Sequence, residues 1–167
     1  VRMENTRSSY LIDDVTVALA EFSEELEDEA PGIDPVSTSP YILNGSAEDG
    51  MNFWSHHGGM ISHSKTQAHT GEHSILISNR SASWNAPLMP VTGLKDDAAY
   101  RFSLFARLVS GMKPSEVQLT VKTVIDGQAT YLPLGSAVAT DDGWVEVPGV
   151  FRTSYLNSAT EVSVNGE

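Results

Sequence analysis

The sequence of 167 residues contains no cysteine and few basic residues. The lack of cysteine excludes disulfide bonds, thiol nucleophiles and cysteine-ligated zinc sites. Only 10 lysines and arginines stand against 22 aspartates and glutamates, which gives a formal net charge of −12. A protein with this charge repels nucleic acids and anionic membrane surfaces. No hydrophobic run approaches the roughly 20 residues of a membrane-spanning helix, so we expect no nucleic acid and no membrane among the partners.

Common catalytic motifs are also missing. The sequence has no nucleophile elbow, no glycine-rich phosphate loop and no arrangement of cysteine with histidine. Its 22 acidic residues still leave room for a carboxylate pair of the glycosidase type. We therefore expect a protein that is not an enzyme, and a small glycan hydrolase or lyase is the alternative.

The length of the sequence predicts one domain that is large enough for a hydrophobic core. Along the chain we expect three parts: residues 1–19 with a displaced strand, residues 20–40 as an acidic linker rich in proline and serine, and residues 41–167 as the main domain. Six acidic residues between positions 21 and 29 favour a linker extended by self-repulsion. A short surface helix over residues 20–29 is the alternative, because glutamate, leucine and alanine are good helix formers.

Short runs of alternating residues, divided by turn residues, follow from Asn44 onward. In Tyr100–Leu108 every second side chain is apolar, which places these side chains on one face of a strand. Val117–Lys122 repeats this alternation, and the turn pair Asp126-Gly127 is typical of a tight hairpin. About eight or nine such segments, without helical periodicity, predict an all-β fold, an antiparallel two-sheet β-sandwich of the jelly-roll type.

Acidic residues at two separate places suggest a metal site. Asp13 and Asp14 interrupt an otherwise apolar strand-like segment, and Glu48 lies near the start of the predicted sandwich. An unpaired carboxylate on the core face of a strand is costly. Calcium removes this cost by collecting about six to eight oxygens, some of them from a loop such as Thr70–His73. The alternative is that Asp13 and Asp14 lie at a strand edge and face water.

Five histidines lie between His56 and His73, which raises the question of a zinc or copper site. Adjacent strand residues point to opposite faces, and no two of these histidines are separated by a single residue. We therefore expect them in polar loops or in a cleft rather than around a metal ion.

The aromatic residues fall into two groups. Trp84 lies within Asn79–Pro87, a run of polar and small residues that is untypical of a core. An exposed indole offers a sugar ring a flat apolar surface, and neighbouring amides can bind its hydroxyls. Tyr131 fits either a second such surface or a packed tyrosine. Trp54 and Trp144 have apolar or turn neighbours, and we expect both in the core.

Several motifs follow one another over residues 44–151, about two thirds of the chain: Glu48-Asp49-Gly50, Trp54, Ala68–Leu76, Ser78-Asn79-Arg80 with Trp84-Asn85, Tyr100–Leu108, Tyr131 and Gly143-Trp144. Their order and spacing resemble those of family 22 of the carbohydrate-binding modules, which shares a superfamily with families 4 and 9. The resemblance implies a calcium-containing jelly roll whose open cleft binds one xylan chain, or a related β-glucan, without cutting it. Such a module would be extracellular, secreted or on a bacterial cell surface, and would hold an attached xylanase on the plant cell wall.

The resemblance also implies the residues of the site. Trp84 and Tyr131 stand at positions that contact sugar, and His57 stands where the family usually has an arginine. Glu4 resembles a ligand-contacting glutamate of the family's penultimate strand, although residues 162–165 compete for the same place. The expected ligand contacts are Trp84, Tyr131, His57, Arg80, Gln118 and Glu4, and the expected calcium ligands are Glu48, Asp13, Asp14 and His73.

The beginning of the sequence departs from the order of the family. A tyrosine-rich strand that ends in Asp-Asp-Val closes the family's domain, yet Tyr10–Val15 comes first here. Either the module is circularly permuted, or it carries the tail of a preceding copy in a tandem array. In both cases we expect residues 10–18 to occupy the place of the last strand, because an empty place would leave an open sheet edge. A monomer or a strand-swapped dimer would satisfy this expectation. A structural or adhesive sandwich of a large surface protein is the alternative function.

Overall fold

The structure is a computed structural model that describes residues 8–20, 40–153 and 159–166, the last segment by its backbone alone. These residues form strands, turns and loops and include no α-helix, so none of them forms a helix that could span a membrane. The strands are β1 (Tyr10–Leu19), β2 (Ser55–His57), β3 (Met60–Ser64), β4 (Ser74–Ser78), β5 (Ala86–Val91), β6 (Ala99–Leu108), β7 (Ser115–Ile125), β8 (Gln128–Ala139), β9 (Val145–Arg152) and β10 (Ala159–Gly166).

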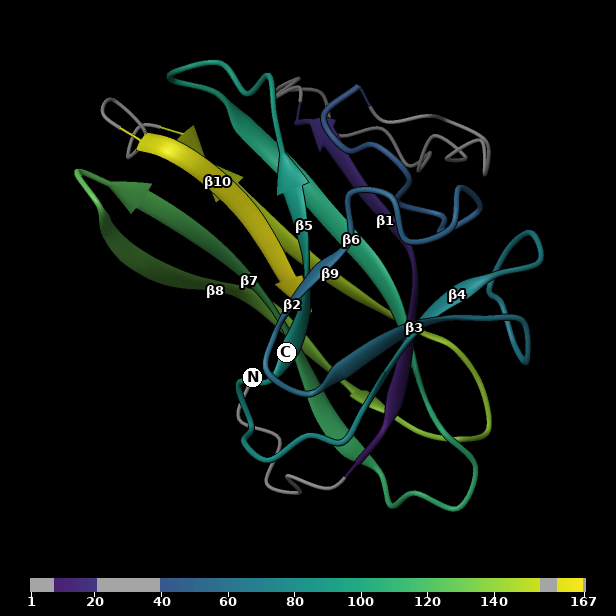
Figure 1. Ribbon diagram of the computed structural model, residues 1–167. Coiled ribbons are helices and arrows are strands. Elements are labelled where there is room, and N and C mark those ends of the chain that lie inside the picture. The colour runs from purple at the N-terminus through teal and green to yellow at the C-terminus, as the bar shows by residue number, and fades with distance from the viewer. Residues whose placement is uncertain (1–7, 21–39, 154–158, 167) are drawn as a thin grey trace.

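The strands form two five-stranded sheets that lie face to face (Figure 1). The first sheet has the order β3-β4-β1-β6-β9, and the second has the order β2-β5-β10-β7-β8. Every strand pair is antiparallel. The predicted antiparallel two-sheet β-sandwich is therefore confirmed.

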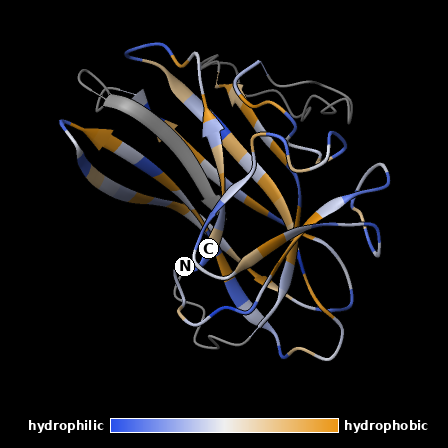
Figure 2. Cartoon of the chain, in the orientation of Figure 1, coloured by the Kyte–Doolittle hydropathy of each residue, from blue (hydrophilic) through white to orange (hydrophobic). Residues whose placement is uncertain are grey.

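The core lies between the sheets and follows the alternation of the sequence. On β6 the five alternating apolar residues from Tyr100 to Leu108 are at most 1% exposed, and on β7 Val117, Leu119 and Val121 are fully buried. Phe102 contacts Phe151 of β9 edge to face, with ring centroids 5.9 Å apart. Figure 2 shows the hydrophobic residues along the strands, with hydrophilic residues mostly in the loops. Burial of one apolar face on each sheet is what holds the two layers together.

Strand β1 occupies the centre of the first sheet, between β4 and β6. Tyr10 pairs in register with Ile77 on one side and with Leu108 on the other. Because β1 pairs with both neighbours, residues 10–18 are an integral part of the sandwich and leave no open edge at this place. Permutation and tandem repetition both stay predictions, and the predicted acidic stretch over residues 21–29 lies outside the described residues.

A bulge in β1 contacts the loop that precedes β2. The register with β6 shifts between Asp13 and Thr16, where Asp14 has a φ of 47°. The backbone N–H of Val15 then donates to the carbonyl of Gly45 at 3.0 Å. Trp54 follows in the same loop, is 9% exposed, and donates from Nε1 to a backbone carbonyl at 3.0 Å. The prediction that Trp54 belongs to the core is confirmed.

Candidate functional site

The second sheet turns one face toward the core and the other away from it, and we call the latter the open face. On β7, Gln118, Thr120 and Lys122 alternate with the buried apolar residues and therefore lie on the open face. The register with β8 places Tyr131 beside Lys122, Pro133 beside Thr120, and Ser136 beside Gln118. On the other side of the sheet, His57 of β2 pairs with Ala86 of β5.

Two large aromatic side chains are exposed at this sheet. Trp84 is 59% exposed and lies in the turn that ends two residues before β5. Tyr131 is 45% exposed on β8. The predicted exposure of Trp84 is confirmed, and of the two readings of Tyr131 the packed one is wrong. Both rings are available to a ligand.

The two rings lie at opposite corners of the open face. Tyr131 shares a row of paired residues with Pro90, which lies six positions after Trp84 in the sequence. Strand residues rise by about 3.3 Å, and neighbouring strands lie about 4.8 Å apart, so the start of β5, two residues after Trp84, lies roughly 13 Å along the strands and roughly 14 Å across them from Tyr131. Such a separation suits an elongated ligand that crosses the sheet rather than a compact one in a pocket.

Arg80 holds the turn that carries Trp84. Its Nε donates to the carbonyl of Asn85 at 2.9 Å and its Nη2 donates to the carbonyl of Ser83 at 2.7 Å. The guanidinium also lies 5.1 Å from the centre of the Tyr10 ring. Arg80 is only 6% exposed, and burial lowers the pKa of its guanidinium. The prediction that Arg80 contacts the ligand is therefore wrong, because its hydrogen-bonding groups face the protein.

The side chain of Asn85 completes the turn. Its Oδ1 accepts the backbone N–H groups of Ser81 and Ala82 at 2.8 and 3.0 Å. Its Nδ2 donates to the carbonyl of His57 at 3.3 Å, which ties the turn to β2. These contacts fix the backbone on both sides of Trp84, so the indole is presented from a rigid support.

The remaining predicted ligand contacts have different surroundings. His57 is exposed on β2, and Gln118 is half-buried on the open face of β7. Thr120 lies between Gln118 and Lys122 and is not among the predicted contacts. It is 2% exposed, and its Oγ1 has no hydrogen-bond partner among the described residues. Glu4 lies outside the described residues.

The two aspartates of β1 bind the loop that precedes β4. Asp13 Oδ2 accepts the backbone N–H groups of His69 and Thr70 at 2.7 and 3.3 Å. Asp14 Oδ1 accepts a hydrogen bond from Thr70 Oγ1 at 2.7 Å, and Asp14 Oδ2 lies 2.6 Å from His69 Nδ1. Burial, and then the charge of Asp14, raise the pKa of Asp13 to about 7. Asp13 is therefore a fully buried carboxyl whose ionised form needs nearby positive charge.

Glu48 and His73 form a second, separate pair. Glu48 Oε1 accepts the backbone N–H groups of Glu72 and His73 at 2.9 Å each, and Oε2 lies 2.8 Å from His73 Nδ1. Burial alone would raise the pKa of Glu48, but these hydrogen bonds lower it below its ordinary value. His73 also stacks on His63, with ring centroids 4.1 Å apart.

The four predicted calcium ligands are thus not brought together as one set. The residues that the structure describes contain no group of three or more histidine, aspartate or glutamate side chains that could hold a metal ion. Asp13 and Asp14 lie side by side, whereas Glu48 and His73 bind each other. Of the four, only the adjacent aspartates offer two carboxylates at one place, and both already accept hydrogen bonds from the loop at His69 and Thr70.

Trp144 lies outside the core, contrary to the prediction. Phe105 alternates with the buried residues of β6 and so faces away from the core, and His69 stacks on it with centroids 3.6 Å apart. Trp144 meets His69 edge-on at 5.9 Å and is half-buried. The indole covers this stack on the outer face of the first sheet, a contact between residues far apart in the sequence.

The chain is similar to parts of two curated xylanases. It is 32% identical over 130 residues to endo-1,4-beta-xylanase 2 of Arabidopsis thaliana, which covers 77% of this chain and 11% of that protein. It is 29% identical over 86 residues to endo-1,4-beta-xylanase A of Thermoanaerobacterium saccharolyticum, which covers 50% of this chain and 7% of that protein. The chain thus spans between 7% and 11% of the length of these relatives.

The fold is similar to that of solved carbohydrate-binding modules. The C-terminal family 22 carbohydrate binding module of Clostridium thermocellum Xyn10B matches with a TM-score of 0.63 at 23% identity, over 72% of this chain and 77% of that one. The family model of the carbohydrate binding domain CBM_4_9 matches residues 39–167. The resemblance inferred from the motifs is confirmed: this chain belongs to the CBM_4_9 family of carbohydrate binding domains.

Proposed function

We propose that this chain binds xylan, or a related β-glucan, along its open face and does not cut it. The observation that carries the proposal is the exposure of Trp84 and Tyr131, 59% and 45%, at opposite corners of that face. Two similar curated proteins are named xylanases, and two similar structures are titled xylan-binding domains. A long, uniform polysaccharide is the ligand class that fits an elongated track between two aromatic rings.

The open face supplies two kinds of contact to such a ligand. The rings of Trp84 and Tyr131 cover the apolar faces of sugar rings, while Gln118 and His57 offer hydrogen-bonding groups to hydroxyls. A few contacts of this kind, on a surface open to water, correspond to a dissociation constant on the order of 10⁻⁵ to 10⁻³ M. Binding is weak for one site, as suits a module that must release and rebind its polymer.

The distribution of carboxylates supports binding without catalysis. Glycosidases usually cleave with a pair of carboxyl groups roughly 5 to 9 Å apart. Among the described side chains of β2, β5, β7 and β8, Glu116 is the only carboxylate. It accepts a hydrogen bond from Ser136 Oγ at 2.5 Å, so it already has a partner within the sheet.

We propose that the module holds a neighbouring enzyme on its substrate. Its similarity to short parts of xylanases supports a place next to a catalytic domain, outside the cell. Binding would then raise the effective concentration of that enzyme at the cell wall. We propose a monomer, because β1 pairs within its own sandwich. Light scattering should give a mass near 18.0 kDa, and twice that mass would indicate a strand-swapped dimer.

Calorimetry with hexasaccharides tests the proposed function. Xylohexaose, cellohexaose and laminarihexaose separate xylan from cellulose-like and β-1,3-glucan ligands. Trp84→Ala should weaken binding at least tenfold without lowering the melting temperature, because the indole is exposed. Val150→Ala is the control, since Val150 is 54% exposed on the opposite sheet. Absence of heat with all three sugars would leave the structural or adhesive sandwich as the better interpretation.

We further propose a structural calcium ion beside Asp13 and Asp14. The buried carboxyl of Asp13 and its raised pKa of about 7 support a cation at this place. Calcium that binds only the folded chain stabilises it by mass action. Chelation should then lower the melting temperature by several degrees, and Asp13→Asn should remove this dependence. An unchanged melting temperature after chelation would contradict the proposal.

A further inference from the structure

Lys122 lies in the middle of the open face, next to one of its two aromatic rings. It is half-buried on β7 and pairs directly with Tyr131 of β8. Directly paired residues of antiparallel strands have Cβ atoms about 4.5 to 5.5 Å apart and share one face of the sheet. A lysine ammonium on its flexible stem can therefore reach a substituent of a sugar ring that lies on Tyr131.

The described surroundings of Lys122 carry little other charge. Strands β5 and β8 contain no aspartate, glutamate, lysine, arginine or histidine. Asp126, in the hairpin turn after β7, lies four residues from Lys122, or about 13 Å along the chain, and Glu116 lies six residues away in the other direction, or about 20 Å. On the side of β10, the backbone of Glu161 pairs with Val124, two residues from Lys122. No salt bridge of Lys122 occurs among the described residues.

A cation at this position is unexpected if the ligand is neutral. The chain has only 10 basic residues against 22 acidic ones, and its net charge of −12 repels an anionic polymer. An anionic ligand therefore needs a local positive charge where it touches the protein. The ammonium of Lys122 supplies such a charge beside the ring that would hold the sugar.

We propose that the open face recognises a β-polysaccharide that carries carboxylate groups, as uronic acid side groups on a xylan backbone do. The backbone sugar lies on Tyr131, and the carboxylate of the side group binds the ammonium of Lys122. This inference rests on the proposed function and specifies the substrate class of the same site. The inference adds one point to the proposed function: a neutral sugar chain does not account for the positive charge of Lys122.

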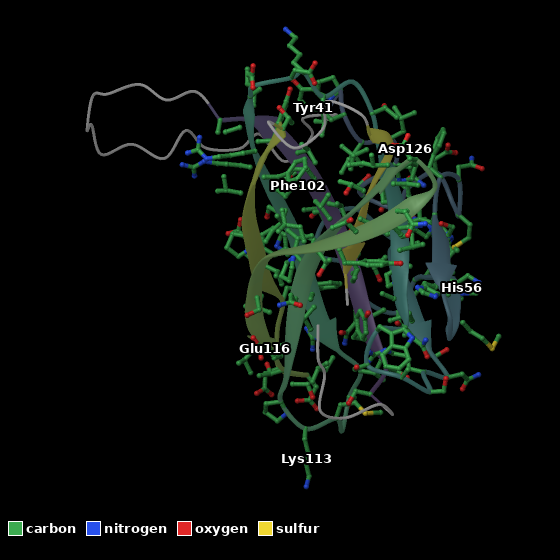
Figure 3. All side chains as sticks on the ribbon, turned by 90° about the vertical axis from the view of Figure 1, so that its left-hand side faces the viewer. Tyr41, His56, Phe102, Lys113, Glu116 and Asp126 are labelled. Atoms are coloured by element: carbon green, nitrogen blue, oxygen red, sulfur yellow. The ribbon has the colours of Figure 1, made fainter. Side chains whose placement is uncertain are left out.

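A pair of ligands that differ only in the acid tests the inference. Binding of xylotetraose and of xylotetraose with one glucuronic acid side group is measured by calorimetry for the unaltered chain and for Lys122→Met, Lys122→Arg and Lys113→Met. Lys113→Met is the matched control, because it removes the same charge at one end of the molecule, where Figure 3 shows Lys113 pointing away from the sheets. Melting temperatures establish that each variant is folded.

The unaltered chain should bind the acidic ligand about two- to fivefold more tightly, the range expected for an exposed ion pair. Lys122→Met should abolish this preference, whereas Lys122→Arg and Lys113→Met should keep it. Raising the salt concentration to 0.5 M should reduce the preference, since screening weakens the pair.

Two results would overturn the inference while leaving the proposed function intact. One is equal affinity of the unaltered chain for both ligands. The other is an equal loss of both ligands in Lys122→Met, which would make Lys122 a donor to hydroxyls. Failure of the unaltered chain to bind either ligand would instead refute the proposed function.

Discussion

Replacing Arg80 distinguishes a residue that supports the binding site from one that touches the ligand. Arg80→Met keeps an unbranched apolar stem but removes the guanidinium. Its two shortest hydrogen bonds to carbonyls, at 2.9 and 2.7 Å, are lost with it. A hydrogen bond from a charged group contributes about 1.5 to 3 kcal/mol, and part of this is regained because the buried charge no longer needs solvation.

The net loss in the free energy of unfolding should be about 2 to 4 kcal/mol. In a domain of this size, each kcal/mol lowers the melting temperature by about 2 to 4 °C, so a decrease of roughly 5 to 15 °C is expected. Affinity for xylohexaose should also decrease, because the turn that presents Trp84 loses its support. Both quantities are measured on the same sample, by differential scanning calorimetry and by titration.

Trp84→Ala is the variant to compare with Arg80→Met. That variant should lose affinity with an unchanged melting temperature, whereas Arg80→Met should lose both. An Arg80→Met variant with an unchanged melting temperature and a strong loss of affinity would show that Arg80 contacts the sugar directly. The buried position of Arg80 would then not describe the bound state.

Three further predictions concern stability. Burial raises the pKa of Asp13 to about 7, so ionisation of this carboxyl disfavours the folded state. With chelator present, the melting temperature should therefore fall as the pH rises from 5 to 8. Asp13→Asn should flatten this profile, and an unchanged slope would contradict the role of Asp13. Gly45→Ala should lower the free energy of unfolding by about 2 kcal/mol in urea titrations, since a Cβ there would lie 2.1 Å from the carbonyl oxygen of Val15. Phe102→Ala should cost about 3 to 5 kcal/mol by the same assay, because Phe102 is 1% exposed in the core. Figure 3 labels this side chain among the strands. A loss below 1 kcal/mol would contradict its place in the core.

The sheets could be predicted from the sequence because strand periodicity is local. In Tyr100–Leu108 the side chains alternate between apolar and mostly polar residues, and a strand converts this alternation directly into a buried and an outer face. The exposure of Trp84 follows from its polar and small neighbours in the same way. Neither inference needs knowledge of a distant part of the chain.

The errors concern contacts between distant segments. Arg80 is buried because it reaches Tyr10, 70 positions earlier, and its own sequence neighbours carry no trace of that contact. Trp144 lies outside the core because its indole packs edge-on against His69, which stacks on Phe105. The four expected calcium ligands do not lie together, because Glu48 pairs with His73 instead.

The position of Lys122 was accessible to sequence reasoning but was missed. The tight turn at Asp126-Gly127 pairs Ile125 with Gln128, and counting back along both strands pairs Lys122 with Tyr131. The count holds up to the bulge between Leu119 and Thr120. A hairpin with a two-residue turn thus fixes which side chains share a face for several residues on either side of it.

Strand β1 also supports the proposed binding site. Arg80 lies over the ring of Tyr10 and donates from Nη1 to the carbonyl of Ser8 at 3.4 Å, while its other nitrogens hold the turn of Trp84. Tyr10 is fully buried at the start of β1, at the centre of the first sheet. The indole on the second sheet is therefore positioned through a residue that is anchored in the first sheet. We therefore expect binding to require β1 in its place at the centre of the first sheet.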